Sequence, residues 1–388
     1  MQVGNAVIDQ KLEELEGKTP YEIWKSIFST EMLKHIVLQT NLYANRDKNN
    51  EKFKVLECEM QKFLGIILLS GYHTLPEEQQ YWSTQPDLRV EIVAKTMSRN
   101  RYLEIKKYMH FADNLKLTPG NKMSKISPLY DMMNKNLVQF DIFHSLVSID
   151  ESMVPYFGRH SAKIFIKGKP IRFGYKIWCI CGNDGFPYHM KIYQGKEDNR
   201  ESLPLGTRVV NDLLDVIISK SDITCHELYF DSFFTSYKLL SELSDKGVRA
   251  TGTVRETIIA NATKKIISSK DLKKEERGTF DFCSDGKIYV AKWHDNSIVT
   301  IASNWENHQP VHKARRRVKG GEKQVPQPHL VCSYNKGMGG VDLMDRLAES
   351  YRPSIRGKKW YWPLFINVVN LSVVAAWRLY SKTCQKNL

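Results

Sequence analysis

Three aspartates that lie far apart in the chain constrain the fold more than any other feature. Asp150 follows the apolar run 146–149, and Asp231 follows the aromatic run 228–230. Such runs predict buried strands, whereas Asp342 follows a glycine pair that predicts the start of a helix. A carboxylate at the end of a buried strand is costly unless something neutralises it. The three segments therefore predict a fold that brings the acids to one partner.

A divalent metal ion is the partner that suits these residues. Hard Mg²⁺ or Mn²⁺ ions prefer carboxylate oxygen, and several carboxylates can share one ion. The sequence has a formal net charge of +14, which indicates a polyanionic partner such as nucleic acid or an acidic membrane surface. A metal site in so basic a protein predicts phosphoryl transfer on nucleic acid.

Each aspartate also has a structural interpretation. Asp231 precedes Ser232 and could form an Asx-turn or a helix cap, and Asp342 could cap the helix that follows it. Asp150 is the hardest to explain without a ligand, because it falls within a strand-like run. These alternatives stay open on the residues alone.

The positive charge is clustered. Residues 157–176 contain no Asp or Glu and are interleaved with aromatic residues, which favours contact with phosphates and bases over a merely solvated surface. Residues 351–388 contain seven Lys or Arg and no acid, and a third group lies at 313–323. The predicted DNA contacts are Arg159, Lys163, Lys167, Lys169, Arg172, Lys176, Arg315, Arg316, Arg317, Arg356, Lys358 and Lys359.

The cysteines and the apolar runs indicate which compartment, metal sites and membrane segments to expect. Seven scattered cysteines indicate a reducing compartment. Cys179 and Cys181 have no second pair to complete a zinc site, so we expect no zinc. The longest apolar runs, 63–69 and 364–377, are too short to span a membrane, and the second predicts a buried core helix. We therefore expect double-stranded DNA, and no membrane, as the partner.

The pattern along the chain predicts a mixed α/β protein in five segments. Residues 1–145 have helical periodicity, and residues 146–256 contain strands in a hairpin and then strands alternating with helices. Residues 257–327 are lysine-rich with short strands and predict an insertion. Residues 328–349 return to the core, and residues 350–388 are helical and basic.

A collinear set of motifs resembles the piggyBac transposase family. The resemblance runs from about residue 21 to residue 380, so it covers most of the chain. Its motifs are Ser148–Ser152, Gly158-Arg159, Lys167–Pro170, Phe173–Lys176, Asp231–Ser236, Gly252–Arg255 and Asn335–Asp342.

The resemblance implies a fold and a reaction. It implies an RNase H-like catalytic core, flanking all-α dimerisation and DNA-binding segments, and a small β-containing insertion. It also implies Mg²⁺-dependent cut-and-paste transposition at TTAA sites. Asp150, Asp231 and Asp342 match the catalytic aspartates, and Asp345 matches a further acidic position on the same helical face. Two Mg²⁺ or Mn²⁺ ions about 4 Å apart would activate a water or a DNA hydroxyl.

The sequence also departs from the family pattern. Family transposases usually continue into a cysteine-rich zinc-binding domain, whereas only Cys384 lies near the end of this sequence. We therefore expect segment 350–388 to be shortened and the zinc-binding domain to be absent. The resemblance implies a nuclear protein and a candidate homodimer. Whether the chain is an active transposase or a domesticated, non-catalytic DNA-binding or chromatin-associated protein stays open.

Overall fold

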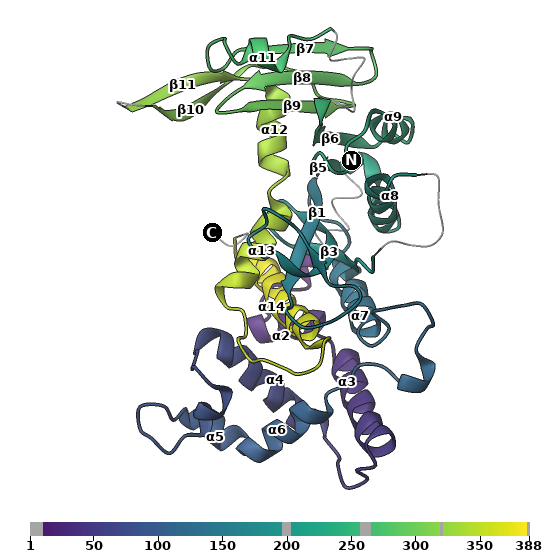
Figure 1. The fold of residues 1–388 in the computed structure, drawn as a ribbon, viewed down its shortest axis with the longest axis vertical. Coiled ribbons are helices and arrows are strands. Elements are labelled where there is room, and N and C mark those ends of the chain that lie inside the picture. Colours follow the sequence, from purple (N-terminus) through teal and green to yellow (C-terminus); the bar gives the residue numbers. More distant parts are fainter. Residues whose placement is uncertain (1–10, 196–202, 257–264, 319–320, 386–388) are drawn as a thin grey trace.

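The computed structural model describes residues 11–195, 203–256, 265–318 and 321–385. The molecule is elongated, with a helical part at one end, a large sheet that runs from the middle to the other end, and a two-stranded ribbon that projects sideways near that end (Figure 1). The predicted start of the insertion at residue 257 and the last three residues of the C-terminal segment lie outside the described residues.

The N-terminal part is helical, as its periodicity predicts. Thr19 caps the first described long helix, since its hydroxyl accepts a hydrogen bond from the Glu22 N–H while the Glu22 carboxylate accepts one from the Thr19 N–H. The helices are α2 (Pro20–Ile27), α3 (Thr30–Leu42), α4 (Glu57–Tyr72), α5 (Glu91–Thr96), α6 (Arg99–Tyr108) and α7 (Ser127–Leu137).

The sheet has the mixed topology of an RNase H-like core. Its central strand β1 pairs antiparallel with β3 on one side and parallel with β5 on the other. Strands β2 and β4 both pair with β3, and β6 extends the parallel side next to β5. The bounds are β1 (Leu146–Pro155), β2 (Ile164–Phe165), β3 (Phe173–Gly182), β4 (Pro187–Ile192), β5 (Glu227–Phe230) and β6 (Arg249–Thr253).

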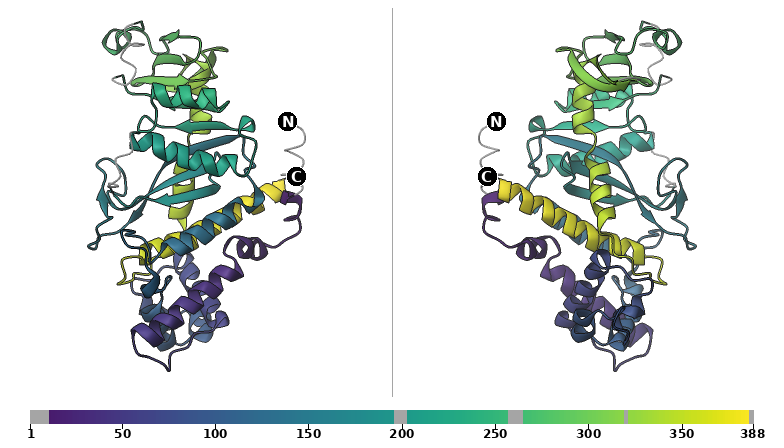
Figure 2. Two further views of the ribbon diagram at one scale, coloured as in Figure 1. Left: turned by 90° about the vertical axis from the view of Figure 1, so that its right-hand side faces the viewer. Right: turned by 90° about the vertical axis from the view of Figure 1, so that its left-hand side faces the viewer.

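Helices cover both faces of this sheet. Helices α8 (Leu205–Ile218) and α9 (Tyr237–Asp245) lie on one face, and α12 (His329–Gly337) and α13 (Gly340–Ser350) lie on the other (Figure 2). Helix α13 packs against β1 and β3. The long helix α14 (Trp362–Gln385) contacts α2, α7 and β1, so the C-terminal segment joins the N-terminal helices to the sheet.

The lysine-rich segment continues the sheet instead of standing apart from it. After the short helix α11 (Ser269–Leu272), β7 (Phe280–Ser284), β8 (Tyr289–His294) and β9 (Ile298–Ser303) form a meander, and β9 pairs with β6. Strands β10 (His312–Val318) and β11 (Gly321–Gln327) form a separate ribbon.

This ribbon places the basic group at 313–323 in two paired strands. The basic run of β10 contains no alternating apolar pattern, and Ala314 and Val325 are the buried apolar residues among the described side chains of the ladder, where Gln327 is also buried. A strand whose other residues are charged or polar gives little periodicity signal in the sequence.

Helix α14 is the one described helix that is long and apolar enough to cross a membrane by length and composition. Its most apolar window is 72% buried inside the fold, as expected for a helix that packs within a protein core. The predicted core helix at 364–377 is therefore confirmed.

Candidate metal and DNA site

The sheet register brings Asp150 and Asp231 together. The parallel ladder between β1 and β5 ends with the pair Ile149 and Phe230. The next residue on each strand is the aspartate, so Asp150 and Asp231 occupy adjacent positions, about 4.8 Å apart in the strand-to-strand direction. Asp150 is only 8% exposed, and Asp231 is half-buried just beyond β5.

Helix α13 carries the other two acids to the same strand. Asp342 is exposed in its first turn, and Asp345 is half-buried one turn later. The Ser152 hydroxyl donates a 2.6 Å hydrogen bond to Asp345 Oδ1, which ties α13 to β1. Close packing depends on Gly340, because a Cβ there would meet the Gly182 carbonyl oxygen at 2.4 Å and Ser148 Oγ at 2.6 Å.

The electrostatics of the site are those of crowded acids. Burial, together with the charges of Glu151 and Asp231, raises the pKa of Asp150 to about 7. Burial also raises the pKa of Asp231 and raises that of Asp345 to about 6, with a contribution from Asp342. Each raised pKa means that the negative charge is unfavourable where it sits and that a cation would be favourable there.

Glu151 joins this group through Lys169 and Lys176, which we predicted from the sequence as DNA contacts. Side chains alternate along a strand, so Glu151 lies on the opposite face of β1 from Asp150 and from Ser152, which reaches α13. The Glu151 carboxylate lies 3.2 Å from Lys169 Nζ and 3.6 Å from Lys176 Nζ. We did not assign Glu151 a role from the sequence, although the lysines following the first aspartate were a signal that it would be paired.

Lys169 lies where these charges meet. Burial opposes its positive charge, but Asp150, Glu151 and Asp342 together raise the pKa of Lys169. Its ammonium group therefore stays charged beside the carboxylates and offsets part of their repulsion.

The donor set fits a hard divalent cation in chemical type. All four candidate ligands are carboxylates, three of them with raised pKa values, and carboxylate oxygen is what Mg²⁺ and Mn²⁺ prefer. Within residues 11–195, 203–256, 265–318 and 321–385, however, no three acidic, histidine or cysteine side chains lie close enough to hold one ion. Asp150, Asp231, Asp342 and Asp345 would hold it after their side chains close around it.

The predicted basic contacts divide into exposed and buried residues. Most are exposed or half-buried, and Phe165 and Phe173 form an exposed, tilted ring pair among them with centroids 4.8 Å apart. Lys176 is buried, with its Nζ 3.7 Å from the Trp178 ring centroid. The Lys359 ammonium donates a 2.6 Å hydrogen bond to the Met109 carbonyl. These two lysines hold the fold together, which differs from the surface contact we expected.

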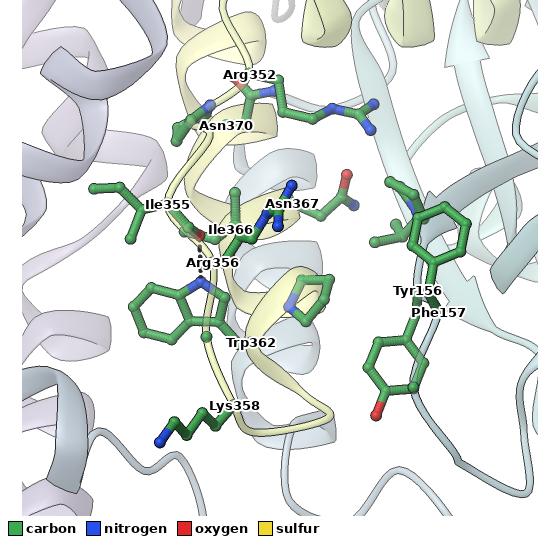
Figure 3. Close-up of a pocket in the computed structure, with 16 residues that line it drawn as sticks. Tyr156, Phe157, Arg352, Ile355, Arg356, Lys358, Trp362, Ile366, Asn367 and Asn370 are labelled. Carbon is green, nitrogen blue, oxygen red and sulfur yellow. Dashed lines mark hydrogen bonds between the residues drawn. The ribbon is translucent and has the colours of Figure 1, made fainter. Parts of the chain in front are cut away.

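A basic pocket of about 580 Å³ adjoins the site. The end of β1 forms one wall with Tyr156 and Phe157, and the segment before α14 forms the other with Arg352, Arg356 and Lys358 (Figure 3). Phe157 is 81% exposed. The Arg352 charge lowers the pKa of Asp345 against the larger effect of burial, so the pocket and the acids share one electrostatic environment.

Comparison with known proteins identifies the family. Residues 19–377 match the sequence family described as Transposase IS4. The chain belongs to the piggyBac-type Transposase IS4 family. It is 39% identical over 374 residues to human PiggyBac transposable element-derived protein 3, and the match covers 95% of this chain and 62% of that protein. It is also 37% identical over 388 residues to human PiggyBac transposable element-derived protein 2, and this match covers 97% of this chain and 64% of that protein.

The chain thus spans less than two thirds of the length of these curated relatives. A solved piggyBac transposase, in a synaptic complex with hairpin DNA, has the same fold with a TM-score of 0.79. At 21% sequence identity, this likeness covers 96% of the present chain and 77% of that one. The predicted RNase H-like core with helical flanks is therefore confirmed.

Proposed function

We propose that this piggyBac-type chain binds duplex DNA and cleaves and joins its strands at TTAA sites. Asp150, Asp231 and Asp342, with Asp345, would hold two Mg²⁺ or Mn²⁺ ions. The observation that carries the proposal is that Asp150 and Asp231, from two adjacent parallel strands, and Asp345, from one helix, are buried or half-buried in one region of the fold and have raised pKa values. Bound ions would polarise the scissile phosphate and lower the pKa of the attacking hydroxyl.

The basic residues would hold the DNA backbone against this site. Lys167, Arg172 and Arg159 are exposed, and they follow β1 closely enough to contact phosphates beside Asp150. Lys163 and Lys169 are half-buried, so their reach is shorter. Across the basic pocket, Arg356 and Lys358 are exposed and would contact the same duplex. The solved piggyBac relative is a complex with hairpin DNA, which supports DNA as the ligand.

A second candidate function is non-catalytic DNA binding in the nucleus, as a homodimer formed through the helical flanks. The open arrangement of the acids favours it, because no described set of three lies within reach of one ion. This function predicts duplex binding that weakens steeply with salt and persists without a divalent ion.

Nicking and joining of a TTAA-containing duplex with Mg²⁺ or Mn²⁺ separates the two candidates. Asp150→Asn keeps the shape of the side chain and removes its charge, and Asp215→Asn, on the exposed surface of α8, is the matched control. Metal-dependent cleavage by the wild type and the control, lost in Asp150→Asn, supports the transposase-type reaction. Salt-sensitive binding by all three proteins with no cleavage by any of them overturns that reaction and supports the binding role.

A further inference from the structure

The ribbon formed by β10 and β11 separates its three consecutive arginines by role. Arg316 points toward the sheet, where its Nε lies 3.0 Å from Asp295 Oδ2 and its guanidinium covers the Trp293 ring at 5.6 Å. Arg277 pairs with the same carboxylate. Arg316 therefore anchors the ribbon and is not free to contact a ligand.

The opposite face of the ribbon is exposed and basic. Side chains alternate along a strand, so Lys313, Arg315 and Arg317 share this outer face, and all three are exposed. Gln324 stands directly opposite Arg315, and Glu322 stands opposite Arg317. Among the described residues, Lys313 and Arg315 have no acidic partner within ion-pair distance.

The base of the ribbon is held rigidly. The Trp293 indole N–H donates a 2.8 Å hydrogen bond to the Pro326 carbonyl. A Cβ at Gly278 would come within 2.8 Å of both Pro326 Cδ and Val325 Cγ1, so the turn before β7 packs tightly on β11. A charged arm fixed in this way loses little conformational entropy when it binds.

The dimensions of the arm match duplex DNA. Residues two apart on one strand lie about 7 Å apart, which equals the axial rise of about two base pairs. Paired strands are about 4.8 Å apart, and the major groove, about 12 Å wide, admits such a ribbon. Figure 1 shows the ribbon projecting beyond the sheet, with α12 between it and α13. Helix α12 has nine residues and is about 14 Å long, so it separates the base of the ribbon from the start of α13, which carries Asp342, by less than one helical turn of DNA.

We infer that the β10–β11 ribbon is a second DNA-binding element, which enters the major groove of the duplex beside the site with Lys313, Arg315 and Gln324. This inference rests on the proposed function, because it takes duplex DNA to be the ligand. It adds a contact away from the carboxylates and assigns Arg316 to the anchor instead of to the DNA.

The test compares two variants of equal charge. Lys313→Gln/Arg315→Gln removes two charges from the outer face, and Lys220→Gln/Lys246→Gln removes two exposed charges at the ends of α8 and α9. The slope of log Kobs against log salt concentration is measured on one duplex. The ribbon variant should lower the magnitude of the slope by about 1.8, at about 0.9 for each lost phosphate contact. The control variant should keep the wild-type slope. The variant Lys313→Arg/Arg315→Lys, which exchanges the two side chains but keeps both charges, should also keep it.

Dimethyl sulfate probing of guanine N7 shows which groove is entered, because N7 faces the major groove. We expect wild-type protection on one flank of the site, lost in the ribbon variant while protection at the site remains. If the wild type binds duplex DNA with the same salt slope and the same flank protection as the ribbon variant, the inference is overturned and the proposed function stands. Wild-type protein that does not bind duplex at low salt overturns both.

Discussion

The hydroxyl of Ser152 on β1 donates a 2.6 Å hydrogen bond to the carboxylate of Asp345 on α13. Burial raises the pKa of Asp345 to about 6, and this hydrogen bond opposes the rise. One serine therefore fixes the helix that carries two candidate metal ligands against the strand that carries a third, and it favours the charged form of Asp345.

Replacing this serine should affect stability and metal binding together. We expect Ser152→Ala to lower the free energy of unfolding by about 1–2 kcal/mol, because a buried carboxylate loses its donor. The pKa of Asp345 should rise, so Mn²⁺ binding should weaken more at pH 6 than at pH 8. Urea denaturation and Mn²⁺ titration at both pH values measure these effects.

Ser148→Ala is the matched control, since Ser148 is buried in the same strand and its hydroxyl has no hydrogen-bond partner in the described part of the chain. Its removal should be close to neutral. Equal losses in the two variants would show that the bond to Asp345 has no special role.

The approach of α13 to the sheet should depend on Gly340. Gly340→Ala places a methyl group 2.4 Å from the Gly182 carbonyl oxygen, which forces α13 away and should cost about 1–3 kcal/mol. Gly339→Ala is the control, because a Cβ at Gly339 meets nothing within 4 Å. Thermal and urea denaturation compare the two variants, and we expect only Gly340→Ala to weaken Mn²⁺ binding. Two equally stable variants would mean that the helix adjusts freely.

Stability without metal should fall as the pH rises. The pKa of Asp150 in the folded protein is about 7, above its ordinary value of 3.8, so the folded state binds this proton more tightly than the unfolded chain. The resulting stabilisation is complete below about pH 4 and is lost as the pH rises through 7. In EDTA at pH 8, Asp150→Asn should therefore be more stable than wild type by on the order of 4 kcal/mol, because each pKa unit corresponds to about 1.4 kcal/mol.

Denaturant midpoints at pH 4.5 and pH 8 check this pH dependence, with the exposed Asp215→Asn as control. The advantage of Asp150→Asn should shrink at the lower pH, and the control should match wild type at both. If the difference in stability between Asp150→Asn and wild type were the same at pH 8 as at pH 4.5, charge crowding at this site would be contradicted.

Lys169 should weaken the binding of Mn²⁺ and strengthen the binding of duplex DNA. Its ammonium group lies beside the acids and pairs with Glu151, so Lys169→Met should tighten Mn²⁺ binding severalfold by removing a competing cation. The same variant should weaken duplex binding and lower the salt slope by about 1 if the lysine contacts a phosphate. Lys167→Met, at an exposed position in the same loop, should weaken only DNA binding. Calorimetric titration with Mn²⁺ and a salt series with DNA separate the effects, and parallel changes in the two variants would contradict this role.

Much of the fold could be predicted because its signals are local. The cap at Thr19, the strands that lead to Asp150 and Asp231, and the helix that opens after Gly339 each depend on residues within one turn or one strand. The expectation that the acids share one partner came from the cost of an unneutralised carboxylate at the end of a buried strand, and the family resemblance added their catalytic role. The β1–β5 register that places two of them side by side is a long-range pairing that local periodicity does not determine.

The residues that were harder to predict are those whose surroundings come from distant segments. Lys176 and Lys359 look like surface cations in the sequence, but one packs on Trp178 and the other bonds to Met109. A long aliphatic stem lets a lysine be buried when its charge finds a partner. Arg316 likewise differs from its two neighbours only because Asp295 and Trp293 lie beneath it.

The most direct measurement is electron paramagnetic resonance of Mn²⁺ binding, made on wild type, Asp150→Asn and the control Asp215→Asn at pH 7.5. We expect two bound ions in the wild type and in the control, and a loss of at least one of them, with weaker binding of the other, in Asp150→Asn. Equal Mn²⁺ binding by all three proteins, or no binding by any of them, would contradict the claim that Asp150, Asp231, Asp342 and Asp345 form a metal site.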